Sequence, residues 1–94
     1  MEKTRRYMLS GEIDHHSSAR LRMEMDALIE KERPRILILD FRYVRLMDSS
    51  GIGLLLGRYK YMKEMGGRIM IANTDKRIDR ILSLSGIYKI IEKA

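Results

Sequence analysis

Cysteine, tryptophan and glutamine are absent from this 94-residue chain, and proline occurs once. Without cysteine the protein forms no disulfide and no thiolate metal site, which suits a reducing, cytoplasmic environment. The opening MEKTRRYMLSGEID is too charged for a signal peptide, and no apolar run approaches the length that spans a bilayer. We therefore expect a soluble, cytoplasmic protein that does not enter a membrane.

The charge balance is moderately basic, with 19 Lys and Arg against 13 Asp and Glu and a net charge of +6. The basic residues are scattered, and they lack the interleaved aromatic side chains on which bases stack. A solvated surface explains them better than direct nucleic-acid binding, which stays open as an alternative function. Hydrophobic residues make up 45% of the chain, which is enough for one folded domain over residues 1–94.

Two short apolar runs have the pattern of buried parallel strands, RILILD at 35–40 and RIMIA at 68–72. Further strands are predicted at 5–9 and 88–91. Between the strands, apolar residues recur at the spacing of an amphipathic helix. The three predicted stripes are Leu21, Met25, Leu28 and Ile29; Ile52, Leu55, Leu56, Tyr59 and Met62; and Ile78, Ile81 and Leu82.

Capping and breaking residues mark the ends of these helices. Asp14 stands where the first helix would be capped, and the helix ends before Pro34. Gly66-Gly67 stops the second helix, while the third is capped within 73–75 and closed by Gly86. The predicted order is βαβαβαβ, an α/β fold with a mostly parallel sheet of about four strands and three helices.

In such a sheet, the loops that leave the carboxyl ends of the strands gather along one edge, where binding sites usually form. The predicted loops are 10–16, 41–50 and 73–75. We expect all three to meet, and we expect the function among them.

The second loop ends in Met47-Asp48-Ser49-Ser50-Gly51, which also opens the second helix. Ser49 or Asp48 could simply cap that helix, a contribution of about 1 kcal/mol. Alternatively, one serine accepts a phosphoryl group, which adds roughly two negative charges beside a helix N-terminus. The residue types alone do not decide between a cap and a phosphorylation site, nor between the two serines.

Other motifs favour no chemistry of their own. The glycines at 51, 53 and 57 do not form a GxxxxGK[ST] loop, so Gly53 and Gly57 are predicted to allow close packing against the sheet or a partner. His15 and His16 are adjacent and do not share a helix face, which makes a metal pair improbable. A hydrolytic triad of Asp14, a histidine and Ser49 stays an alternative, although no GxSxG elbow surrounds the serine.

Four segments together resemble the anti-sigma factor antagonists of the STAS family. DSSG is typical of the wider family, whereas the Asp-His-His triplet and Gly-Arg-Tyr-Lys resemble its sporulation branch. The resemblance runs through almost the whole chain, in Ser10 to His16, Met47 to Gly53, Leu56 to Lys60 and Leu84 to Ile91.

The resemblance implies a regulator without catalytic chemistry, cofactor or metal. Its unphosphorylated form would capture an anti-sigma factor that is also a serine kinase, and so free the sigma factor. Phosphorylation of Ser49 would end the capture, and a PP2C-type phosphatase would restore it; ATP and metal belong to those partners. The matching partner-binding residues are Asp14, Asp48, Ser49, Ser50, Gly51 and Ile52.

The chain departs from the family pattern at its ends, since a strand before 5–9 and a helix after the last strand are missing or reduced. The sheet edge at 5–9 is then less protected, which leaves a monomer, strand exchange or a weak dimer open. A STAS module that binds its partner without phosphorylation is the alternative within the fold.

Overall fold

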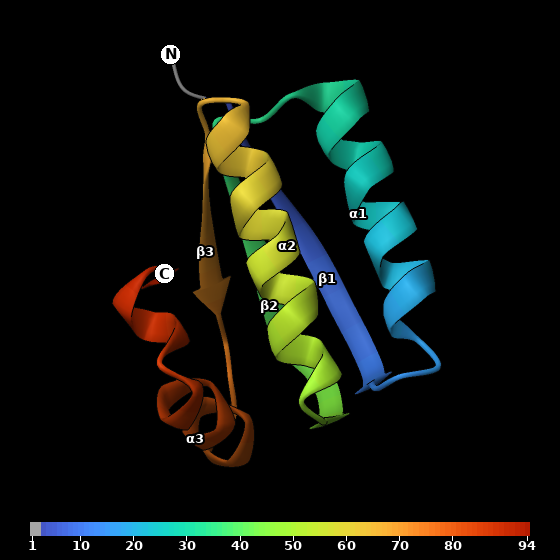
Figure 1. The fold of residues 1–94 in the computed structure, drawn as a ribbon, viewed down its shortest axis with the longest axis vertical. Coiled ribbons are helices and arrows are strands. Elements are labelled where there is room, and N and C mark those ends of the chain that lie inside the picture. Colours follow the sequence, from blue (N-terminus) through green and yellow to red (C-terminus); the bar gives the residue numbers. More distant parts are fainter. Residues whose placement is uncertain (1–2) are drawn as a thin grey trace.

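The computed structural model describes residues 3–94, and Figure 1 shows strands and helices alternating along them. The elements are β1 (Thr4–Ile13), α1 (Ser18–Glu32), β2 (Ile36–Met47), α2 (Ser50–Glu64), β3 (Arg68–Ala72), α3 (Lys76–Ser85), a 3-10 helix η1 (Ile87–Lys89) and β4 (Glu92–Lys93). All neighbouring strands pair in parallel. The predicted α/β class and the order βαβαβαβ are confirmed.

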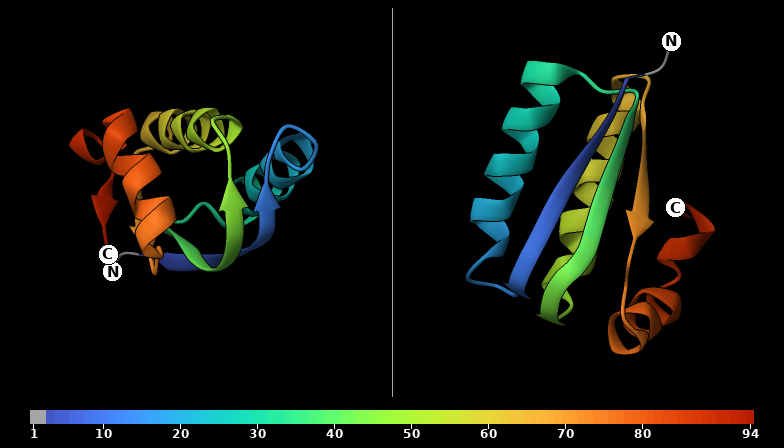
Figure 2. Two further views of the ribbon diagram at one scale, coloured as in Figure 1. Left: turned by 90° about the horizontal axis from the view of Figure 1, so that it is seen from below. Right: turned by 180° about the vertical axis from the view of Figure 1, so that it is seen from behind.

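The spatial order of the strands is β1-β2-β3-β4, the same as their order in the chain. Right-handed crossovers that always step in one direction place their helices on the same face of a sheet. Accordingly, α1 and α2 lie together on one face, and the view from behind shows strands in front of both helices (Figure 2). One face of the sheet is therefore covered by these two helices (Figure 2).

The core fills the space between the sheet and these two helices. Leu37 and Leu39 of β2 are fully buried, as are Met25 and Ile29 of α1 and Met62 of α2. Burying an aliphatic side chain of this size contributes about 1.5–3 kcal/mol. Ile36 and Ile38, on the other face of β2, are only half-buried. The prediction that RILILD is a buried strand is therefore confirmed for the face under the helices and wrong for the opposite face.

The predicted helix ends are largely confirmed. Arg33 adopts a left-handed conformation (φ 47°) and closes α1 just before Pro34. Gly66 (φ 80°) follows α2, and Gly86 (φ 82°) is the C-cap of α3. At the other end of α3, the Asp75 carboxylate accepts a hydrogen bond from the Ile78 N–H at 2.8 Å. A positive φ costs glycine little, which explains its use at two of these stops.

The first two strands are longer than predicted, and the prediction that 10–16 and 41–50 are loops was wrong for 10–13 and 41–47. The cause is an irregular register: Met8 pairs with Asp40, yet Ser10 pairs with Tyr43, so β2 gains a residue. A second shift follows between Gly11 and Glu12. Such bulges break the period-two pattern that identifies a strand.

The predicted strand at 88–91 was also wrong. Residues 87–89 form η1, and the short β4 comes after it at 92–93. The Ile91 N–H donates to the Ile87 carbonyl at 2.9 Å, and this turn buries both isoleucines. The apolar residues of this segment are buried by a helical turn, and their pattern in the sequence was mistaken for that of a strand.

Candidate functional site

The first loop of the site is the β1–α1 turn at 14–17. The Asp14 carboxylate accepts hydrogen bonds from the backbone N–H groups of His16 and Ser17, both at 2.9 Å. These bonds, the one from Ser17 first, lower the pKa of Asp14. The prediction that Asp14 is the helix N-cap was wrong, because the turn over 15–17 moves the cap to Ser17. Asp14 instead fixes the shape of the turn, and its charge stays at the surface.

The second loop is a tight turn at Asp48. Its carboxylate accepts from the Ser50 N–H at 2.8 Å and also from the Ser50 hydroxyl. The Ser50 hydrogen bonds lower the pKa of Asp48, whereas the nearby Asp14 carboxylate raises it. Asp48 is therefore an exposed anion at neutral pH whose orientation is set by Ser50.

The two loops are joined directly. The Asp48 N–H donates to the Ile13 carbonyl at 3.0 Å, and the backbone N–H of His15 helps to lower the pKa of the Asp48 carboxyl. Two carboxylates from different loops are thereby held on one surface, as the sheet topology predicts.

The two serines differ sharply in their surroundings. Ser49 is exposed and is the N-cap of α2, but its side chain makes no capping hydrogen bond, and none to any other residue within 3–94. Ser50 is half-buried, and its hydroxyl is engaged by Asp48. Of the two residues considered as caps, Ser49 makes no capping hydrogen bond, whereas the Asp48 carboxylate accepts from the first N–H of α2. Ser49 therefore presents a free hydroxyl.

The amides at the start of α2 are already satisfied. Asp48 accepts from Ser50 through its carboxylate and from Gly51 through its carbonyl (3.0 Å), and the Ser49 carbonyl accepts from the Ile52 N–H (3.1 Å). A group added to the Ser49 hydroxyl would consequently find none of these donors free. It would project outward, beside Asp48.

Gly51 holds this turn against the ends of β1 and β2. A Cβ at this position would lie 2.5 Å from the Met47 Cγ and Sδ atoms and 3.3 Å from Ile13 Cγ2. Glycine is thus required by a close approach, and not by its φ angle. Ile52, one residue further on, is half-buried against the core.

The third predicted loop does not join the other two. Residues 73–75 lie at the same end of the sheet in Figure 1, but within 3–94 none of their hydrogen bonds reaches Asp14 or Asp48. Asn73 donates to the Asp40 carboxylate at 2.9 Å, and Thr74 donates to Asp79 at 3.2 Å. The candidate site consequently rests on two loops.

Two alternatives find no matching geometry in residues 3–94. Neither histidine ring hydrogen-bonds to Ser49; the rings of His15 and His16 instead pack edge to face, with centroids 5.8 Å apart. In the same range, no group of three or more His, Cys, Asp or Glu side chains converges as metal ligands would. The helices described there are also too short or too polar to cross a bilayer.

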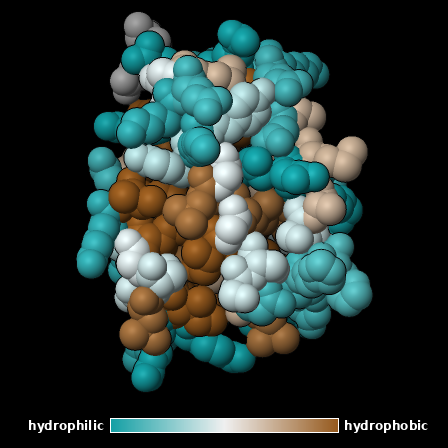
Figure 3. Space-filling model, in the orientation of Figure 1, coloured by the Kyte–Doolittle hydropathy of each residue, from teal (hydrophilic) through white to brown (hydrophobic). Residues whose placement is uncertain are grey.

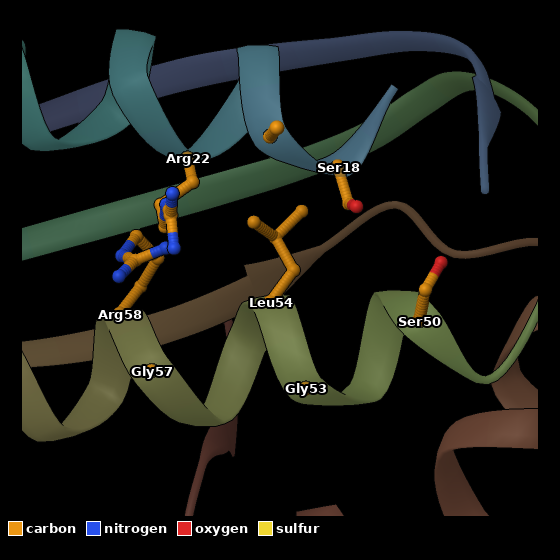
Figure 4. Close-up of a pocket in the computed structure, with 8 residues that line it drawn as sticks. Ser18, Arg22, Ser50, Gly53, Leu54, Gly57 and Arg58 are labelled. Carbon is orange, nitrogen blue, oxygen red and sulfur yellow. The ribbon is translucent and has the colours of Figure 1, made fainter. Parts of the chain in front are cut away.

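Sequence reasoning missed a groove between α1 and α2, which Figure 4 shows with Ser18 and Ser50 at one end and Arg22 and Arg58 at the other. Its volume is about 310 Å³, and the lining is Ser18, Ala19, Arg22, Ser50, Gly53, Leu54, Gly57 and Arg58. A Cβ at Gly53 or Gly57 would meet nothing within 4 Å. Of the two predicted alternatives, close packing against the sheet is therefore wrong, and packing against a partner stays a prediction. The spacing Gly-x-x-x-Gly-Arg was the available signal.

The sheet geometry, the DSSG turn and the two joined loops define a STAS fold, and the comparisons agree. A family model described as STAS domain matches residues 2–94. The chain is 40% identical over 83 residues to the anti-sigma F factor antagonist of Paenibacillus polymyxa, covering 88% of this chain and 71% of that protein. The chain therefore belongs to the STAS family, among its anti-sigma factor antagonists.

Solved structures give the same result. The anti-sigma factor antagonist SpoIIAA in its unphosphorylated form superposes with a TM-score of 0.83 at 29% identity, covering all of this chain and 82% of that one. The Bacillus cell fate determinant SpoIIAA in the phosphorylated form gives 0.72 at 29% identity, covering all of this chain and 85% of that one. The relatives thus include a protein studied in both phosphorylation states.

Proposed function

We propose that residues 1–94 act as one partner-switching module that captures an anti-sigma factor with serine kinase activity, and that phosphorylation of Ser49 ends the capture. The observation that carries the proposal is the contrast between the free, exposed hydroxyl of Ser49 and the engaged hydroxyl of Ser50. A kinase needs an accessible acceptor oxygen, and only Ser49 offers one within the turn. The family names of the relatives support the partner.

The proposed capture surface comprises Asp14, Asp48, Ser49, Ser50, Gly51 and Ile52. Asp14 and Asp48 supply negative charge, Gly51 brings the turn close to the strand ends, and Ile52 adds a half-exposed apolar contact. A docking partner would exclude water from Ser49 while it binds these neighbours.

Phosphorylation would oppose that docking through charge. The phosphate adds roughly two negative charges next to Asp48 and Asp14, which already carry one each. The amides of Ser50, Gly51 and Ile52 are bonded elsewhere, so the fold offers the phosphate little compensation. Desolvating an unpaired charge under a partner costs several kcal/mol. A PP2C-type phosphatase would remove the phosphate and restore the capturing form.

The test is intact mass and peptide mapping after incubation with the candidate kinase and ATP. Wild type should gain one phosphate on Ser49, Ser49→Ala none, and the matched control Ser50→Ala one. Ser49→Ala should bind the kinase without release by ATP, and Ser49→Asp should bind poorly. Stable binding without any phosphate would replace the switch by a passive scaffold. Tight binding by Ser49→Asp would contradict exclusion by charge.

A further inference from the structure

The α1–α2 groove starts where the capture surface ends, because Ser50 belongs to both. Figure 4 shows Leu54 and Arg58 extending from α2 toward α1, while Gly53 and Gly57 stand one turn apart on α2 and add no side chain to the groove. Glycine is disfavoured in a helix interior relative to alanine. Since a Cβ would meet nothing within 4 Å at either position, packing inside this chain gives no steric reason for glycine.

The far end of the groove holds an underpaired arginine. The side chain of Arg58 is 9% exposed, and its Nε lies 2.8 Å from Asp26 Oδ1. That contact lacks hydrogen-bond geometry, so both atoms are buried without a hydrogen bond among residues 3–94. A buried guanidinium normally satisfies several of its five N–H groups. The Nε group is held against Asp26, and the two terminal nitrogens of Arg58, which make no hydrogen bond within residues 3–94, are the donors left beside the groove.

A second arginine adds to the positive charge. Arg22 of α1 lines the same groove, and Figure 4 shows its guanidinium next to that of Arg58. Burial lowers the pKa of Arg58; Asp26 opposes this shift, and Arg22 adds to it by repulsion. Of these two arginines only Arg58 is paired with a carboxylate within residues 3–94, which leaves the groove with an excess positive charge.

We propose that the α1–α2 groove binds the carboxylate of an Asp or Glu side chain from the protein that docks on the Ser49 surface. The guanidinium fork of arginine matches a carboxylate with two parallel hydrogen bonds. The groove continues the capture surface, so one partner can occupy both, and the empty space at Gly53 and Gly57 admits the incoming chain. The identity of this partner rests on the function proposed above; the chemistry of the groove does not.

The first test measures the dissociation constant for the unphosphorylated protein and the kinase by calorimetry. Gly53→Ala and Gly57→Ala should melt at the same or a higher temperature, yet bind roughly tenfold or more weakly, because the methyl groups fill the groove. Arg22→Ala should also weaken binding about tenfold. The charge-matched control is Lys60→Ala, an exposed change on α2 outside the groove, and it should bind as wild type does.

The second test needs no kinase. A capped tetraglutamate peptide, titrated into isotope-labelled protein, should shift the amide signals of Gly53 and Gly57 in a saturable way, and Gly57→Ala should abolish the effect. A tetraglutamine peptide and sodium phosphate serve as comparisons. Absence of any shift with tetraglutamate would overturn the proposal. Equal shifts with phosphate, together with unchanged kinase binding by Arg22→Ala, would overturn it too, because the groove would then be a site for free anions.

The two proposals fail separately. If wild type does not bind the kinase, the proposed function fails, and the peptide titration still decides the groove. If wild type and the groove variants bind the kinase equally well, the groove proposal fails and the proposed function stands.

Discussion

The guanidinium of Arg6 lies 2.6 Å from the carboxylate of Asp40, across the boundary between β1 and β2. Asp40 is almost fully buried, and it also accepts from the Arg42 N–H and the Asn73 amide, both at 2.9 Å. Burial alone raises the pKa of Asp40, but these three bonds outweigh it and lower the pKa. One carboxylate thus connects β1, β2 and the end of β3.

Because the folded state lowers the pKa of Asp40, its charge stabilises the fold above the ordinary pKa of 3.8, and this contribution is lost as the pH falls through the lower folded value. We expect Asp40→Asn to reduce the free energy of unfolding at neutral pH by about 1–3 kcal/mol. The loss should shrink as the pH is lowered below about 4. Urea unfolding across this range checks it, with Arg6→Met as the variant that removes one partner. A loss independent of pH would contradict the assignment.

The contact between Gly51 and Met47 predicts a difference between two glycines of one helix. Gly51→Ala forces a Cβ to within 2.5 Å of the Met47 side chain, so we expect a destabilisation of about 1–3 kcal/mol. Gly53→Ala, the matched control, meets no atom and should stabilise the fold by up to about 1 kcal/mol. Thermal melts of the two variants give the comparison. Equal effects would mean that Met47 moves aside freely.

Two tyrosines, Tyr7 and Tyr88, should ionise at a higher pH than an ordinary tyrosine. Burial, reinforced by hydrogen bonds to carboxylates, raises the pKa of Tyr7 and of Tyr88 to about 12. A folded pKa above the ordinary value of 10.0 means that stability is complete below pH 10 and falls as the pH rises toward 12. Titration by tyrosinate absorbance should show a late component that Tyr7→Phe and Tyr88→Phe each reduce. An unchanged late component in both variants would refute this.

The cap of α3 should act locally. Asp75→Ala removes the carboxylate that accepts from Ile78, which should cost about 1 kcal/mol. Since the 73–75 loop does not bond to the Ser49 turn, faster hydrogen exchange is expected in α3 and not at the start of α2. Lys76→Ala, an exposed change one residue later, is the control. Equal acceleration in α2 would show that the 73–75 loop and the Ser49 turn open together.

Much of the fold could be predicted because the residues that begin and end its helices act locally. Pro34, Gly86 and Asp75 act through their own backbone geometry or first-turn amides, which a sequence displays directly. The extension of β2 to Met47 could not, since its bulges depend on pairing with a distant strand and move the buried positions to Val44 and Met47.

The site shows the same division. Asp48 and Ser49 are contiguous and open a helix, so the motif could be found, and the topology correctly placed Asp14 beside them. The sequence could not distinguish Ser49 from Ser50, because the difference depends on the orientation of the Asp48 carboxylate, which engages the Ser50 hydroxyl. The Arg22–Arg58 groove could not be predicted, because it depends on the distance between α1 and α2. The spacing of residues within one helix does not give that distance.

The strands lie side by side in the same order as in the chain, and this order also affects how the chain folds. Thr4 pairs with Ile36, Ile36 with Arg68, and Met70 with Glu92, so every step closes a segment of 32, 32 or 22 residues. Loop-closure entropy rises only slowly with length, and no pairing has to bridge the whole molecule. As the chain leaves the ribosome, the β1–α1–β2 unit is complete first, and α2 follows it. The Ser49 turn lies between β2 and α2, so its formation depends on elements that precede β3 in the chain.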